Sequence, residues 1–307
     1  MILKRILMMC LRYFKILSYF FLSFFLFLSL FGCGKAIVLP IDQRKMSVIT
    51  TTPMIADMVD HIAGHRVIVR SLVEHDFHFK SFEMTDEWEE KILAADVVFS
   101  HGLAFDQVLT DQLLVLGVQS SVVTKYMKDH DLIFNLEFPL LYDPYVWQDP
   151  LLWVHAIDAV RDQLIALDPK NRRLYLRQAK LYYHKIMSIH DQLSHGFKGI
   201  ENRILVTSKD SLNYFKRRYD FEVLSVYVMT TVNRQLLDVQ ADEALWVNQF
   251  YVSSANLTLL FQKGGHGDFI PSLYTLGLGN FGSLAGTYLG MMVYNKEVLI
   301  DGFKNKN

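Results

Sequence analysis

The chain has 307 residues, of which 51% are hydrophobic and 21% are charged, with 31 Lys and Arg balanced against 32 Asp and Glu. This length suits one large domain or two medium-sized ones, and the composition excludes disordered and collagen-like chains. The net charge of −1 excludes, at the level of composition, a strongly basic nucleic-acid-binding protein. The chain has only two cysteines, which excludes a disulfide-rich scaffold and a cysteine-rich zinc module.

The N-terminus has the layout of a secretory signal. A basic stretch without acidic residues precedes 16 almost entirely apolar residues, 16–31, which are fewer than the ~20 that a membrane-spanning helix needs. We predict a signal peptide over residues 1–32, followed by a tether over residues 33–45. The basic residues of this segment are Lys4, Arg5, Arg12 and Lys15.

The boundary of the predicted signal, Leu30-Phe31-Gly32-Cys33, is similar to a bacterial lipobox, whose cysteine becomes the lipidated first residue of the mature protein. Two or more acyl chains on one residue are enough for stable membrane anchoring. The alternative is an anchor that stays uncleaved, with Cys33 as an ordinary apolar residue. Both alternatives predict a chain that lies outside the cytoplasm, periplasmic or on the cell surface, and is tethered to a membrane.

The first part of the mature chain alternates predicted strands and helices. Thr52 is a predicted N-cap with Pro53 at the first helical position, and Asp86 with Glu89 forms a predicted capping box. Strands and helices at this spacing indicate a parallel sheet covered on both faces. The predicted strands are 46–52, 66–73, 97–100 and 121–126, and the predicted helices are 53–63, 86–95 and 106–116.

The middle of the chain is predicted to be helical, with no strand from Leu151 to His195. Asp168-Pro169 is a strong helix start, and a helix from Pro169 to about Gly196 is about 42 Å long at ~1.5 Å per residue. The alternative is two shorter helices in a bundle. The predicted buried stripe of the long helix consists of Leu174, Leu181, Ile186, Ile189 and Leu193.

Alternation resumes after Gly199, with predicted strands at 203–207, 221–228 and 250–254 and helices at 211–218 and 241–248. The predicted fold is therefore α/β, with two parallel-sheet lobes joined by a long rigid helix. Ligands of open α/β sheets bind beyond the carboxyl ends of the strands, so we expect the ligand in a cleft between the lobes. The predicted domains are an N-terminal lobe over 46–150, a helical connector over 151–200 and a C-terminal lobe over 201–307.

Enzyme motifs are absent from the sequence, which has no GxSxG elbow, no Walker A loop and no HExxH helix, so we predict no catalytic activity. His75, Asp76 and His78 are the tightest histidine-containing cluster. This group is interpreted either as a weak metal site or as a solvated loop.

Five segments together resemble the substrate-binding lipoproteins of bacterial manganese, zinc and iron ABC importers, the solute-binding protein family 9. The resemblance implies two lobes with a rigid connecting helix, a divalent cation bound between the lobes, and delivery of that cation to a membrane permease and its ATPase. The segments are Ile49–Val59, Ala95–Leu103, Asp143–Pro150, Val206–Tyr219 and Ala285–Asn295.

The metal-ligand positions that the resemblance implies are changed in this chain. The family uses three nitrogen ligands, usually histidines, and one carboxylate. The matching positions here hold Lys80, Tyr145 and Lys209 in place of the nitrogen ligands and Leu276 in place of the carboxylate. A lysine ammonium has no lone pair for a metal and repels a dication, and leucine has no ligating atom. We therefore expect weaker binding of zinc, manganese or iron than in the family, or none, at these positions.

Three hypotheses remain. The chain is a metal importer's binding protein with shifted ligands such as His75, Asp76 or His78. Alternatively, the lysines bind an anionic solute or metal chelate, or hold the lobes together with nothing bound. A third hypothesis is a non-transport protein of the cell envelope, for example in cell adhesion. We predict a monomeric solute-binding component of an ABC importer of the metal-ion class, with a permease and an ATPase as partners and no nucleic-acid binding.

Overall fold

The computed structural model describes residues 44–73, 82–136, 138–225, 244–253, 255–262 and 268–305. The predicted signal peptide, Cys33, and the loop with His75, Asp76, His78 and Lys80 lie outside these residues. No helix within the described ranges is long and apolar enough to cross a bilayer.

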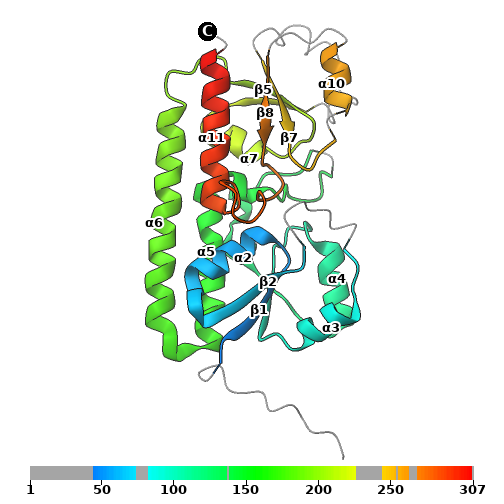
Figure 1. The fold of residues 1–307 in the computed structure, drawn as a ribbon, viewed down its shortest axis with the longest axis vertical. Helices are drawn as coiled ribbons and strands as arrows, with labels where there is room; N and C mark the ends of the chain where they lie inside the picture. Colours follow the sequence, from blue (N-terminus) through cyan, green and yellow to red (C-terminus); the bar gives the residue numbers. More distant parts are fainter. Residues whose placement is uncertain are drawn as a thin grey trace, which may run out of the picture. The chain divides into compact units, whose positions relative to one another are not determined.

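The first sheet is parallel and has the strand order β2-β1-β3-β4. Together with the helices that follow its strands, it forms what we call the first lobe (Figure 1). Thr52 caps the first of these helices and Pro53 is its first residue, as the sequence predicts. The elements are β1 Met46–Thr50, β2 Val67–Ser71, β3 Val97–Ser100, β4 Ser121–Val122, α2 Pro53–Ala63, α3 Asp86–Leu93 and α4 Gln107–Val115.

The second sheet repeats this organisation with the order β6-β5-β7-β8, and all of its pairs are parallel. It forms the second lobe with its own helices, and Pro271 in β8 is tolerated because β8 is an edge strand. The elements are β5 Ile204–Thr207, β6 Glu222–Ser225, β7 Leu245–Gln249, β8 Asp268–Leu273, α7 Asn213–Tyr219, α10 Ala255–Gln262 and α11 Tyr288–Asn305.

Two long helices, α5 Pro150–Leu167 and α6 Arg172–Gly196, connect the lobes and run antiparallel to each other (Figure 1). Residues 169–171 form a 3-10 turn that leads directly into α6, so the predicted long helix is continuous and the alternative of two shorter helices is wrong. The buried side of α6 packs in one hydrophobic core that includes β1 of the first lobe and β5 of the second.

Several boundary predictions are wrong for local reasons. The N-cap of α3 is Thr85, whose hydroxyl accepts from the Trp88 N–H at 3.3 Å, and not Asp86. The predicted strand 121–126 is only two residues long, because β3 ends at Ser100 opposite Val122 and leaves the following residues without a partner strand.

The larger error concerns the second lobe. Residues 241–248 are predicted as a helix and 250–254 as a strand, whereas the strand is β7, Leu245–Gln249, and the described residues after it form a turn. Leu245, Trp246 and Val247 are fully buried beside β5, so tertiary pairing overrides the local pattern. The helices α10 and α11 and the strand β8 were not predicted.

The buried stripe of α6 is also shifted from the predicted one. Ile186, Ile189 and Leu193 are buried as predicted, but Tyr182 is buried in place of Leu181, which is 50% exposed. The Tyr182 hydroxyl donates to the buried carboxylate of Asp57 on α2 at 3.0 Å. Burial, followed by the negative charge of Asp57 and the hydrogen bond to it, raises the pKa of this phenol well above its ordinary value, so the phenol stays protonated as a donor.

This shift predicts a large loss of stability for one of two adjacent substitutions and a small loss for the other. Tyr182→Ala is expected to lower the free energy of unfolding by about 3–5 kcal/mol, because it leaves a cavity and removes a buried hydrogen bond. Leu181→Ala is expected to cost less than about 1 kcal/mol. Urea denaturation of both variants measures this, and a larger loss for Leu181→Ala would contradict the observed register.

Candidate functional site

The loop Asp143–Asp149, which we call the junction loop, joins the first lobe to the second. Its Trp147 indole N–H and its Gln148 amide both donate to the carbonyl oxygen of Thr275, at 3.2 and 2.7 Å. Thr275 follows β8, so the contact reaches the carboxyl edge of the second sheet. All three residues are at most 1% exposed, and water therefore does not compete for these hydrogen bonds.

The carboxyl ends of β5, β7 and β8 bring Lys209, Gln249 and Thr275 together, because neighbouring parallel strands end at the same edge of a sheet. The Gln249 side chain accepts from the Lys209 N–H at 2.7 Å. Its amide nitrogen lies 3.1 Å from the Lys209 carbonyl oxygen, 2.7 Å from the Ser211 hydroxyl and 3.0 Å from the Thr275 hydroxyl. Gln249 therefore determines the shape of the loop that carries Lys209.

The structure brings two of the predicted site residues into contact across the lobes. The Lys209 ammonium nitrogen lies 5.7 Å from the centre of the Tyr145 ring, within the range of a cation–π interaction. Tyr145 is buried, and Phe105 and Trp147 pack against its ring edge-on. Leu276 is buried next to Thr275 in the same core, while the placement of Lys80 lies outside the described residues.

Asp143 is a buried acid of this site that the sequence analysis did not single out. Its carboxylate accepts from the Tyr145 N–H at 2.8 Å and from the Asn213 amide at 2.9 Å. Burial raises the pKa of the Asp143 carboxyl to about 6; the two hydrogen bonds and the charge of Lys209 oppose this shift, and the charge of Asp210 adds to it. The quoted Asp143–Pro150 segment contained this residue, but no spacing in the sequence indicated its partners.

Asp149, at the other end of the junction loop, is also bound across the lobes. Its carboxylate accepts from the Leu151 N–H at the start of α5, so that it caps this helix. Arg218 of α7 binds both oxygens of Asp149 at 2.8 Å each. A bidentate guanidinium–carboxylate pair of this kind also fixes orientation, so α7 is held against the start of α5.

His101 contacts the junction loop, and its surroundings indicate a structural role. Its Nε2 lies 2.9 Å from the Pro144 carbonyl oxygen, and its ring packs against Phe105, Trp147 and Trp153. Burial lowers the pKa of His101, so the ring is neutral and donates to this carbonyl. Throughout the described ranges, no three His, Cys, Asp or Glu side chains converge on a position that could hold a metal ion.

Residues 48–302 match the family model described as zinc-uptake complex component A, periplasmic. The chain belongs to this family. The manganese-binding lipoprotein MntA of Bacillus subtilis (strain 168) is 26% identical over 294 residues, which cover 90% of this chain and 95% of MntA. The zinc-binding protein TroA of Treponema pallidum (strain Nichols) is 25% identical over 279 residues, which cover 83% of this chain and 88% of TroA.

Solved structures agree with this membership at the level of the fold. The periplasmic zinc-binding protein TroA from Treponema pallidum superposes with a TM-score of 0.75 and 23% identity, over 84% of this chain and 99% of that chain. A crystal structure of ZnuA superposes with a TM-score of 0.71 and 16% identity, over 84% of this chain and 99% of that one. The predicted α/β fold with two lobes and a long helix is confirmed.

The raised pKa of Asp143 predicts a pH dependence of stability in this family member. In the unfolded chain the Asp143 carboxyl has a pKa near 3.8, so between about pH 4 and about pH 6 the folded protein binds more protons at this group than the unfolded chain does. The contribution of the protonated Asp143 carboxyl to the free energy of unfolding is therefore fully present at low pH and is lost as the pH rises through about 6. Asp143→Asn removes this contribution, and the loss of stability between about pH 4.5 and about pH 7.5 is expected to shrink by about 2 kcal/mol.

Chemical denaturation at the two pH values measures this effect. Asp129→Asn, at an exposed position, is the matched control and is expected to keep the wild-type pH dependence. An unchanged pH dependence in Asp143→Asn would show that Asp143 is already ionised in the folded protein at low pH.

Proposed function

We propose that this chain is the extracytoplasmic solute-binding component of an ABC importer of the metal-ion class, which presents its cargo to a membrane permease and its ATPase. Family membership over residues 48–302 supports this role. Relatives named as a manganese-binding lipoprotein, a zinc-binding protein and an iron ABC transporter substrate-binding lipoprotein make a divalent cation the expected class of cargo. The predicted Cys33 lipid anchor agrees with the word lipoprotein in the names of these relatives.

The contact between Lys209 and Tyr145 supports a proposal about how strongly the chain binds a metal ion. An ammonium group at this position offers no lone pair and repels a dication at short range. Tyr145 is buried and Leu276 has no donor atom. We therefore propose that Lys209 occupies the position between the lobes at which relatives hold their ion, and that this chain binds divalent metals there more weakly than they do.

An anionic cargo is less consistent with the surroundings of Lys209. Burial raises the pKa of the Asp143 carboxyl; the charge of Asp210 also raises it and the charge of Lys209 lowers it, so both groups act on Asp143 electrostatically. The positive charge of Lys209 is thus already offset by neighbouring acid groups. A site for an anion requires uncompensated positive charge or free donors, so this alternative gains no support.

The proposed absence of a tight metal site is tested by titrating the purified full-length chain in detergent with Zn²⁺, Mn²⁺ and Fe²⁺. No stoichiometric submicromolar binding is expected at Tyr145, Lys209 and Leu276. Restoring the family donors with Lys80→His, Tyr145→His, Lys209→His and Leu276→Asp together is expected to raise zinc affinity at least about tenfold, because imidazole and carboxylate donors replace non-ligands.

Lys216→His on the exposed side of α7 is the matched control for an added histidine, and it is expected to leave affinity unchanged. Tight, stoichiometric binding by the wild-type chain would contradict the proposed role of Lys209. If that binding were lost in His75→Ala together with His78→Ala, the cargo would be assigned to their loop.

Transport is tested separately by deleting the gene and measuring cellular zinc, manganese and iron. Accumulation of one of these metals is expected to fall under metal limitation and to return when the wild-type gene is supplied. Unchanged accumulation of all three would contradict the importer role and favour a non-transport function in the cell envelope.

A further inference from the structure

The outer side of α6 carries a concentration of positive charge that the proposed function does not use. Residues 169–190 contain six Lys and Arg and no Asp or Glu, in a chain whose net charge is −1. All six are exposed, and we call the surface that they form with Leu176, Leu181 and Tyr183 the basic face. The six residues are Lys170, Arg172, Arg173, Arg177, Lys180 and Lys185.

Among the described residues, five of the six cations of the basic face have no ion-pair partner on the helix packed beside them. Asp158 of α5, which lines a cavity together with Lys180, and Asp162 of α5 both form ion pairs with Arg161 of the same helix. Within the part of the chain that the structure describes, Arg172, Arg173, Arg177, Lys180 and Lys185 form no ion pair. The face is therefore available to a negatively charged partner.

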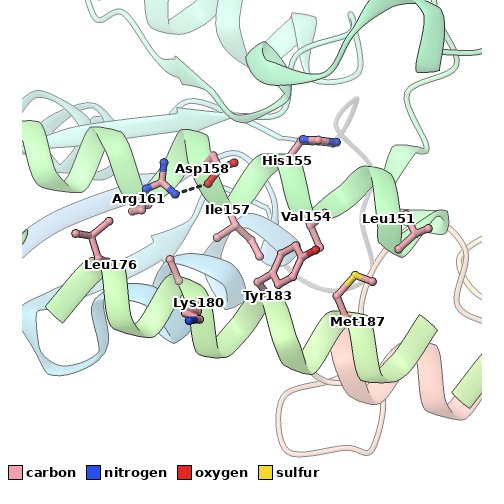
Figure 2. A pocket seen from close by; sticks show the side chains of 11 residues that line it. Leu151, Val154, His155, Ile157, Asp158, Arg161, Leu176, Lys180, Tyr183 and Met187 are labelled. Carbon is pink, nitrogen blue, oxygen red and sulfur yellow. Dashed lines mark hydrogen bonds and ion pairs between the residues drawn. The ribbon is translucent and has the colours of Figure 1, made fainter. Parts of the chain in front are cut away.

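Large apolar side chains lie among these cations. Leu176, Leu181 and Tyr183 are 39%, 50% and 41% exposed. Leu176 and Tyr183 also line a cavity of about 510 Å³ between α5 and α6, in which the Tyr183 ring lies beside Val154 of α5 and Leu176 lies toward Arg161 (Figure 2). Basic residues interspersed with exposed leucine and an aromatic are typical of helices that lie on anionic lipid surfaces.

The basic face begins at the end of the molecule where the described chain starts. Met46, at the start of β1, is paired with Val67 of β2, and the preceding Arg66 forms an ion pair with Asp168 at 3.4 Å. Asp168 is followed directly by the turn and the first cations of α6. Arg44 lies 11 residues after Cys33, and this stretch spans at most about 40 Å even when fully extended, so an anchor at Cys33 keeps this end within about 40 Å of the membrane.

We propose that the basic face binds the anionic phospholipid headgroups of the membrane to which the chain is tethered, and that this contact orients the protein on that membrane. The proposal rests on the membrane tether of the proposed function and is independent of which cargo is bound. Charge complementarity and the short tether both select lipid as the occupant, because the tether keeps the face within reach of headgroups at a high effective concentration.

The experiment uses the full chain reconstituted in nanodiscs of phosphatidylcholine alone or mixed with phosphatidylglycerol. An amine-reactive reagent labels lysines, and mass spectrometry gives the labelling rate of each one. Labelling of Lys180 and Lys185 is expected to slow at least about threefold on the anionic discs, and salt at about 0.5 M is expected to reverse this. Lys216 of α7 and Lys304 of α11, which are also exposed, are expected to label at the same rate on both discs.

Charge-reversal variants make the test specific to the face. Arg172→Glu, Arg173→Glu and Arg177→Glu combined are expected to abolish the slowing at Lys180 and Lys185. The matched control, Lys198→Glu, Lys216→Glu and Lys304→Glu combined, changes the net charge equally elsewhere and is expected to keep it. Circular dichroism and thermal melting establish that both variants are folded.

Several results would overturn the proposal. Equal labelling of Lys180 and Lys185 on both kinds of disc would show that the face does not bind anionic lipid. Equal slowing of all lysines on the anionic discs would indicate adsorption without a preferred face, and protection that requires the permease would assign the face to a protein partner. Loss of the chain from both kinds of disc would instead show that the tether of the proposed function has failed.

Discussion

The junction loop is the constraint on which the arrangement of this protein depends. Between Asp143 and Asp149 it makes hydrogen bonds to Asn213 and Thr275 and an ion pair to Arg218, all in the second lobe. Each of these bonds uses a buried group, so breaking one leaves a polar atom or a charge without compensation in the interior. The two parallel sheets therefore share one core instead of forming independent domains.

The same loop also contains Tyr145, one of the positions at which the resemblance implies a metal ligand. The backbone N–H of Tyr145 donates to the Asp143 carboxylate, and the ammonium group of Lys209 lies over the Tyr145 ring. The resemblance to metal-binding lipoproteins implies that the family holds a metal ion at the corresponding positions. Here a positive charge that belongs to the protein lies between the lobes, and it is partly balanced by an acid with a raised pKa. The fold of the family is retained, and we propose that the chemistry between the lobes is changed.

Long helices with one buried side leave their other side available for a different role. The buried side of α6 contacts both lobes, through the bond of Tyr182 to Asp57 and the contact of His190 with Tyr219. The opposite side carries the basic face and does not contribute to this packing. A substitution on the basic face leaves the core intact, so the charges on this side of α6 can change without loss of the fold.

The sequence by itself determined the elements whose signals are local. Thr52 and Pro53 begin a helix, and the alternation of strands and helices predicts parallel sheets, because caps and periodicity depend on neighbours in the chain. The resemblance also identified Tyr145, Lys209 and Leu276 as positions near one another. Only the tertiary structure decided that Leu245–Gln249 is a strand, since its pairing with β5 outweighs a pattern that resembles a helix.

Tertiary structure likewise decided which side of α6 is buried and which acids and amides surround Lys209. Tyr182 is buried in place of Leu181 because its hydroxyl finds Asp57 on a helix more than a hundred residues away in the chain. Gln249 and Asp143 become part of the site through contacts with the Lys209 loop and with Asn213. Single polar residues of this kind carry no periodic or motif signal, because their role depends entirely on partners that folding brings to them.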